Sequence, residues 1–149
     1  MTTSLSATSI FISFTELQSF ISNGLQAAGL PSADANKVAT LMAEADLQGS
    51  DGHGVIRLVP YVKRIMAGGI NTRPNIHVVN ERAAMAVVDG DNGMGHLVMS
   101  YAAELAIGKA RTAGVAWVGA RHSNHAGPAS LYARMPIAQD MIGLYFAVG

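Results

Sequence analysis

Cysteine is absent from this chain of 149 residues, and both charged and aromatic residues are scarce. Without cysteine the chain has no disulfide framework, no thiolate nucleophile and no cysteine ligand for zinc. Only 13% of the residues are charged, ten acidic against ten basic, so the formal net charge is zero. Because binding to phosphate backbones needs clustered Lys and Arg, this balance argues against a nucleic-acid partner.

The chain also lacks a long hydrophobic run. No segment approaches the roughly 20 consecutive apolar residues that a membrane helix needs. The N-terminal stretch has no basic segment followed by apolar residues, as a secretory signal would. We therefore expect no membrane association and a cytoplasmic protein. Half of the residues are nevertheless hydrophobic, which predicts a globular fold with a substantial core.

The first half of the sequence is predicted to be helical. Helices are expected over about residues 14–28, 32–47 and 55–67. Ser13 and Glu16 fit a capping box before the first helix, and Ser32 can cap the second. Together with a loose arm over residues 1–12, these helices form an N-terminal helical subdomain that is expected to span residues 1–72.

The second half, residues 73–149, alternates strands with helices. Strands are expected over residues 76–79, 84–88, 115–120 and 142–148, and helices over residues 96–113 and from residue 128. This alternation predicts βαβ units and a mixed or largely parallel sheet, so the fold class is α/β. The glycine-rich segment Gly90–Gly95 has the order GxxGxG rather than GxGxxG, which argues against a Rossmann fold.

The segment from Arg121 to Pro128 has the strongest functional pattern. It packs two histidines, Ser123 and Asn124 into eight positions directly after a predicted strand, where α/β proteins place ligands. His125 fits a general acid that protonates a carbonyl oxygen, because an imidazole titrates near neutral pH. A loop histidine bonded to backbone is an equally good interpretation. His122 is expected to be a structural or surface residue.

A second polar cluster covers residues 51–57. Glycines flank His53 just before a predicted helix, and Arg57 follows four positions later, where its guanidinium could hold a carboxylate. From spacing alone the simpler interpretation is favoured, a capping loop with Arg57 paired to Asp51. Tyr61 could donate a hydrogen bond to a substrate, although a half-buried packing role is more common for tyrosine.

No metal site is predicted, because the sequence has no HxxxH or HExxH spacing and no acidic cluster. His77 and His96 are predicted to be surface or capping residues, and Trp117 to be a packing residue in a strand. Backbone N–H groups of the segment Gly90–Gly95 could meet a phosphate, which leaves open a small-molecule binding module. A tight turn between strand and helix is the simpler interpretation there.

Four stretches resemble the malate/L-lactate dehydrogenase family, which also includes ureidoglycolate and sulfolactate dehydrogenases and the piperideine-2-carboxylate reductases. They are residues 45–61, 67–71, 88–95 and 114–127. The resemblance covers nearly the whole chain from about residue 13, and the motifs are specific jointly rather than singly. It implies a fold unlike the Rossmann domain, which agrees with the missing glycine fingerprint.

The resemblance implies an oxidoreductase that uses NAD or NADP and interconverts small 2-oxo and 2-hydroxy acids, or related imino acids, by hydride transfer. His125 would donate the proton in reduction and accept it in oxidation, with His53 beside it at the catalytic centre. Arg57 and Tyr61 would bind the substrate. The side chains expected to contact the cofactor are His53, Ser123, Asn124 and His125. Members are usually homodimers or larger homo-oligomers.

The sequence departs from the family pattern in three respects. Gly52 stands where members commonly have Ser, so one hydrogen bond to substrate or cofactor would be lost. Pro136 interrupts a helix that is usually unbroken. Family members are also much longer, so this chain is expected to be only their N-terminal part. The alternative is therefore a truncated or split member that folds or associates but is not catalytic alone.

Overall fold

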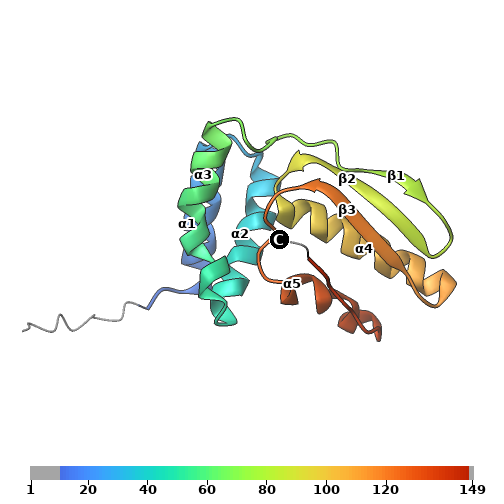
Figure 1. Cartoon of the computed structure of the whole chain (residues 1–149). Helices are drawn as coiled ribbons and strands as arrows, with labels where there is room; N and C mark the ends of the chain where they lie inside the picture. The colour runs from blue at the N-terminus through green and yellow to red at the C-terminus, as the bar shows by residue number, and fades with distance from the viewer. Residues whose placement is uncertain (1–10, 148–149) are drawn as a thin grey trace, which may run out of the picture.

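The structure of the chain is a computed structural model that describes residues 11–147 (Figure 1). Its elements are, in chain order, α1 (Phe14–Ala27), α2 (Ser32–Leu47), the 3-10 turns η1 (Asp51–His53) and η2 (Val55–Arg57), α3 (Leu58–Met66), β1 (His77–Glu81), β2 (Met85–Gly93), α4 (Gly95–Ala113), β3 (Trp117–Ser123), α5 (Ser130–Ala133) and the 3-10 turn η3 (Met135–Gln139). Helices come first and a small mixed sheet follows, which confirms the predicted α/β class. The predicted arm lies mostly outside the described residues.

The N-terminal helices form as predicted, with two differences at their starts. The capping box is confirmed, since the Ser13 side chain accepts the Glu16 backbone N–H and the Glu16 carboxylate accepts the Ser13 N–H. The predicted cap at Ser32 is wrong: Pro31 occupies the N-cap, and its fixed φ suits that extended position. The third helix starts late, at Leu58, because a 3-10 turn precedes it.

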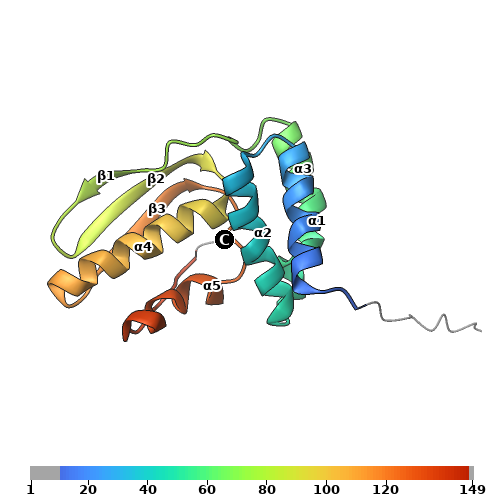
Figure 2. The same cartoon turned by 180° about the vertical axis from the view of Figure 1, so that it is seen from behind.

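The sheet has the order β1-β2-β3, with β2 antiparallel to β1 and parallel to β3. Helix α4 is the crossover between β2 and β3 and covers one face of the sheet, as Figure 2 shows from behind. Val98 and Ala102 of α4 pack there against Val88 of β2. This βαβ unit brings the carboxyl ends of β2 and β3 next to the start of α4.

Both parallel strands run further than predicted. β2 continues to Gly93 and β3 to Ser123, so the strands extend into segments that were expected to be loops. Asp91, Asn92 and His122 take positive φ in these extensions, which is uncommon for residues other than glycine. The loop after β3 therefore begins only at Asn124.

The last predicted strand is wrong within the described part of the chain. Residues 141–147 have no regular secondary structure, and residue 148 lies outside the described residues. Pro136 cuts the preceding helix to a short α5 and a 3-10 turn, and nothing in the described sheet pairs with the segment that follows. Trp117 lies in β3 but is 58% exposed, with its ring stacked on Phe146.

The main core joins the helices to the start of α4. Buried side chains of α1, α2 and α3 pack with Met94, the N-cap of α4, and with Leu97 in its first turn. The helical side of the molecule is therefore fixed against the end of the sheet where β2 and β3 finish (Figure 1). Among residues 11–147, no helix is both long and apolar enough to cross a membrane.

Candidate active site

The loop after β3 is anchored to the glycine-rich segment before α4. Gly93 pairs with Ser123 in the sheet, and the Asn124 backbone N–H donates to the Gly93 carbonyl oxygen at 3.3 Å. The Asn124 side-chain amide also donates to the carbonyl oxygens of Asn92 and Gly93, at 2.8 Å and 3.0 Å. The position of the histidine that follows is therefore set by the ends of both parallel strands.

Gly95, the first residue of α4, lies where this loop crosses the helix. A Cβ built on Gly95 would lie 2.1 Å from the Asn124 carbonyl oxygen and 2.5 Å from that of His125. Real Cβ atoms do not approach backbone this closely, so only glycine allows the crossing. The third glycine of the GxxGxG segment thus has a packing role in this structure.

We predict that Gly95→Ala destabilises the fold, because the backbone it meets cannot rotate away as a side chain could. Overpacking of this kind costs about 1–3 kcal/mol. Gly108→Ala on the same helix is the matched control, since a Cβ there meets nothing within 4 Å. It should stabilise the chain by about 0.5–1 kcal/mol. Urea unfolding of both variants checks this, and equal stabilities would contradict the close crossing.

The other glycines of this segment also lie in close packing. A Cβ on Gly90 would lie 2.7 Å from the His122 carbonyl oxygen, and one on Gly93 would lie 2.7 Å from Pro74. His122 itself is exposed and pairs through Nδ1 with Asp89 at 3.0 Å. Within residues 11–147, no three His, Asp or Glu side chains lie close enough together to hold a metal ion.

His125 is hydrogen-bonded to Tyr61 of α3. The Tyr61 hydroxyl oxygen lies 2.6 Å from Nδ1 of His125, and the Gly127 backbone N–H donates to the same nitrogen at 3.4 Å. Burial raises the pKa of Tyr61 to about 12, although Arg57 acts in the opposite direction. The tyrosine is therefore protonated at neutral pH. Both contacts engage Nδ1, so Nε2 is the nitrogen that can meet a substrate.

His53 and Arg57 come from the two 3-10 turns and lie beside this pair. The rings of His53 and His125 stack with centroids 5.4 Å apart and planes 17° apart. The Arg57 Nε donates to the Gly52 carbonyl oxygen at 2.6 Å, rather than pairing with Asp51 as the simpler interpretation expected. The structure thus brings together His53, Arg57, Tyr61 and His125.

Asp46 of α2 holds the turns in place. Its carboxylate accepts the Val55 backbone N–H at 2.7 Å, which joins the end of α2 to the start of η2. A Cβ on Gly54 would lie 1.8 Å from Oδ1 of Asp46, so a side chain there would displace the carboxylate from this position. His53 precedes Gly54 in the chain and Arg57 follows it. The link to Asp46 thus helps to hold both residues near the loop after β3.

The surroundings of His125 favour its neutral form. Burial is the largest cause that lowers the pKa of His125 from its ordinary value of 6.5, and the neighbouring Arg57 guanidinium and the His53 ring act in the same direction. A neutral imidazole can accept a proton at neutral pH. The cluster therefore combines a proton acceptor with a guanidinium.

Ser123 and Asn124 lie at the edge of this cluster. Ser123 is exposed at the end of β3, and its hydroxyl donates to the Asn124 carbonyl oxygen at 3.1 Å. The Asn124 amide nitrogen is used to anchor the loop. Both residues lie within two positions of His125 in the chain, but their side chains are hydrogen-bonded to backbone groups.

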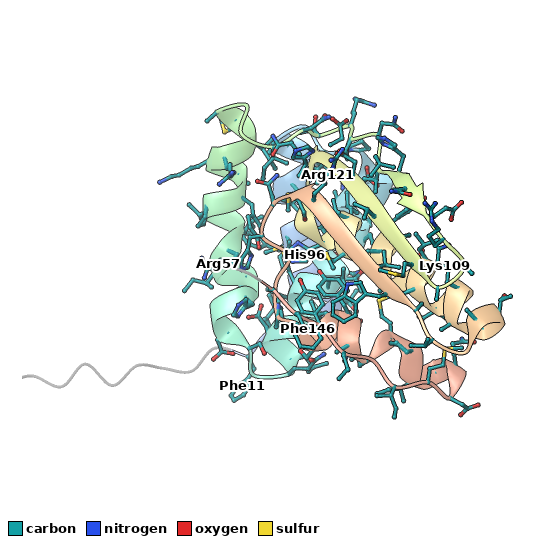
Figure 3. The ribbon with its side chains drawn as sticks, turned by 45° about the vertical axis from the view of Figure 1, so that its right-hand side comes forward. Phe11, Arg57, His96, Lys109, Arg121 and Phe146 are labelled. Carbon is teal, nitrogen blue, oxygen red and sulfur yellow. The ribbon has the colours of Figure 1, made fainter. Side chains whose placement is uncertain are left out.

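His96 was predicted to be a surface or capping residue, and this is wrong. It is 0% exposed and lies between the helices and the sheet, whereas Arg57 lies on the helical side (Figure 3). Its ring contacts Tyr61 in a T-shaped arrangement with centroids 5.7 Å apart. The local signal in the sequence was the apolar pair that follows His96, Leu97 and Val98; the burial of residues 93–98 is seen only in the structure.

Comparison with known proteins decides the family. The profile of the family described as malate/L-lactate dehydrogenase matches residues 12–148. The chain belongs to the malate/L-lactate dehydrogenase family. This membership confirms the resemblance that the sequence motifs indicated.

Individual relatives agree with this assignment. The malate dehydrogenase of Pyrococcus abyssi is 45% identical over 129 residues, which cover 87% of this chain and 36% of the relative. The L-sulfolactate dehydrogenase of Methanocaldococcus jannaschii is 42% identical over 120 residues, covering 80% and 35%. The solved malate dehydrogenase of Pyrococcus horikoshii OT3 superposes with a TM-score of 0.84 at 42% identity, covering 87% and 37%. The chain therefore spans little more than a third of these relatives.

Proposed function

We propose that this chain carries the proton-transfer and carboxylate-binding residues of an NAD- or NADP-dependent dehydrogenase that interconverts 2-oxo acids and 2-hydroxy acids. The observation that carries the proposal is the hydrogen bond between the Tyr61 hydroxyl and Nδ1 of His125, with the Arg57 guanidinium nearby. Reduction of a 2-oxo acid needs an anchor for the carboxylate and a proton for the forming alkoxide. The relatives support this substrate class, because malate and sulfolactate are both 2-hydroxy acids.

In this proposal Arg57 binds the substrate carboxylate. A guanidinium can hold a carboxylate through two parallel hydrogen bonds, which fixes its orientation as well as its position. The 2-oxygen of the substrate would then meet Nε2 of His125, because Nδ1 is engaged with Tyr61 and Gly127. His53, stacked on His125, would border the substrate on the side of the 3-10 turns.

His125 would transfer the proton, assisted by Tyr61. In reduction, the imidazolium gives the proton on Nε2 to the alkoxide, and Nδ1–H then donates to the Tyr61 hydroxyl oxygen. In oxidation, the neutral imidazole with its proton on Nδ1 takes the hydroxyl proton of the 2-hydroxy acid at Nε2. The Gly127 N–H, whose 3.4 Å contact needs an unprotonated Nδ1, does not donate to the ring in these states. A hydroxyl group both donates and accepts, so Tyr61 can remain hydrogen-bonded to Nδ1 in both states.

The residues at the edge of the cluster fit the nicotinamide end of the cofactor in part. Several groups here can contact a nicotinamide ring and its carboxamide. They are the exposed hydroxyl of Ser123, the side-chain carbonyl of Asn124 and the imidazoles of His53 and His125. Gly52 offers no side chain where the family commonly has Ser. When bound, the cofactor supplies or removes the hydride. The chain's contribution is orientation and the proton.

The proposed function is tested by following NADH and NADPH oxidation with oxaloacetate, pyruvate, a sulfonated 2-oxo acid and a cyclic imino acid. The amides of the same 2-oxo acids are the matched control, because they lack the anion that Arg57 would bind. The 149-residue chain and the whole product of its natural gene are assayed in parallel. Turnover that requires the carboxylate supports the proposal, and equal turnover of acid and amide contradicts it.

The rate should depend on pH through His125. Its pKa is lowered below 6.5, and the neutral form is the base in oxidation. We therefore expect kcat/KM for the 2-hydroxy acid to rise with pH, with a midpoint below 6.5, and to be level at neutral pH. For reduction, which needs the imidazolium, kcat/KM should fall through the same midpoint. A midpoint above 6.5, or equal slopes in the two directions, would count against His125.

The alternative is a family member that associates but turns nothing over alone. It is favoured by the 36% share of the relative that the chain covers, and by the exposed apolar side chains of Met85 and Trp117, which are neighbours on the sheet. A homodimer or larger homo-oligomer, as the resemblance implies, is also part of the proposal, and so is a cytoplasmic location. Turnover by the natural gene product but not by the chain would select this alternative.

A further inference from the structure

His96 has no obvious structural reason to be a histidine. It is 0% exposed, and neither of its ring nitrogens has a hydrogen-bond partner among residues 11–147. Burying polar ring atoms without partners destabilises a fold relative to an apolar side chain of similar shape. A group of this kind in a native fold calls for an explanation, and a role in a neighbouring functional site is one of those known.

The neighbours of His96 are the two groups that contact Nδ1 of His125. The Tyr61 ring meets His96 in a T-shaped contact with an interplanar angle of 81°, and the Tyr61 hydroxyl lies 2.6 Å from Nδ1. A Cβ built on Gly127 would lie 3.0 Å from Nε2 of His96, and the Gly127 N–H lies 3.4 Å from Nδ1. One buried imidazole therefore supports both contacts of the His125 ring.

We propose that His96 is a positioning residue for His125. By holding the Tyr61 ring and the Gly127 backbone, it keeps both groups at Nδ1 and so orients Nε2 of His125 toward the substrate. The catalytic consequence rests on the proposed function, whereas the positioning itself can be measured without any turnover.

The size and charge of the imidazole suit this role. A Cβ at Gly127 would lie 3.0 Å from Nε2 of His96, tighter than most Cβ contacts, so a longer ring in place of His96 would press on the loop. Burial lowers the pKa of His96 to about 3, and the charges of His125 and His53 contribute in the same direction. His96 is therefore uncharged while His125 titrates, and it does not compete for the proton.

The first test is a histidine titration by NMR on the full 149-residue chain, without substrate or cofactor. The groups that face His125 are Tyr61 of α3, Arg57 and His53 of the two turns, and His96 of α4. In His96→Ala we expect the titration midpoint of His125 to move toward 6.5. We also expect the NMR signal of the hydrogen-bonded Tyr61 hydroxyl proton to disappear. His96→Gln keeps the length and polarity of the side chain, so the His125 midpoint should move by no more than half as much as in His96→Ala.

Ser100→Ala is the matched control. Ser100 is buried one turn further along α4 and donates to the His96 carbonyl oxygen, so its removal disturbs the same helix without removing the imidazole. It should leave the His125 midpoint unchanged. A double-mutant cycle with Tyr61→Phe completes the test, because effects exerted through Tyr61 are not additive. If His96→Ala does not fold, His96→Gln and Ser100→Ala are compared in the same way.

Kinetics of the active protein form the second test. His96→Ala should lower kcat about 10- to 100-fold, as expected for a displaced catalytic group, with KM within twofold because Arg57 is untouched. Unchanged titration of His125 and unchanged kcat in a folded His96 variant would overturn the inference. If the wild type turns nothing over but His96→Ala alters the His125 titration, the positioning role stands and the proposed function is rejected.

Discussion

Replacement of His125 by Ala should lower kcat by about 10²- to 10⁴-fold, the range typical of general acid–base groups. The reason is that, among the described residues, no other side chain combines a hydrogen bond to Tyr61 with a lowered histidine pKa. Nδ1 of His125 is held by the Tyr61 hydroxyl at 2.6 Å, and its pKa is lowered so that the neutral base predominates. The loss should fall on kcat rather than KM, because the substrate carboxylate would still be bound by Arg57. Steady-state assays in both directions measure it.

His122→Ala is the matched control for this prediction. His122 lies three residues earlier in the same segment, but it is exposed and its Nδ1 contacts Asp89 at 3.0 Å. Its replacement should change kcat by no more than a few fold. A His125→Ala variant within tenfold of the wild type would remove the proton-transfer role from His125. A large loss in His122→Ala would assign a role in turnover to the His122–Asp89 pair.

Local patterns in the sequence were sufficient to predict much of the fold. The capping box at Ser13, the crossover helix and the strands on either side of it were all recognisable, because short-range capping and hydrophobic periodicity determine them. The extension of β2 and β3 was not, because it depends on pairing between Gly93 and Ser123 across the sheet. The final strand was wrong since a strand needs a neighbour, which no local pattern provides.

The candidate site was predictable only in part for a similar reason. The motif around His53 and the one around His125 were each recognisable. Their proximity in the fold was not, since the two histidines are 72 positions apart in the chain. His96 was misassigned because its burial comes from tertiary contacts with Tyr61 and Gly127. For His96, the apolar neighbours in the sequence were thus a better marker of a site than its being a histidine.

Replacement of Arg57 by Ala should raise KM for the 2-oxo acid about 10- to 100-fold, as expected when charge-assisted hydrogen bonds to a carboxylate are lost. The effect on kcat should be smaller, because the Tyr61–His125 hydrogen bond does not involve Arg57. Arg64→Ala is the matched control. Arg64 is exposed on α3 and, like Arg57, donates through Nε to a glycine carbonyl, that of Gly69. Its replacement should leave KM unchanged.

Arg57→Lys separates the charge of Arg57 from its shape. The positive charge of Arg57 contributes to the lowered pKa of His125, so Arg57→Ala should move the pH midpoint upward while Arg57→Lys keeps it near that of the wild type. Lysine has no planar fork, however, so Arg57→Lys should still raise KM. An unchanged KM in Arg57→Ala would remove Arg57 from the carboxylate. A midpoint that moves equally in both variants would show that the guanidinium acts on His125 through position rather than charge.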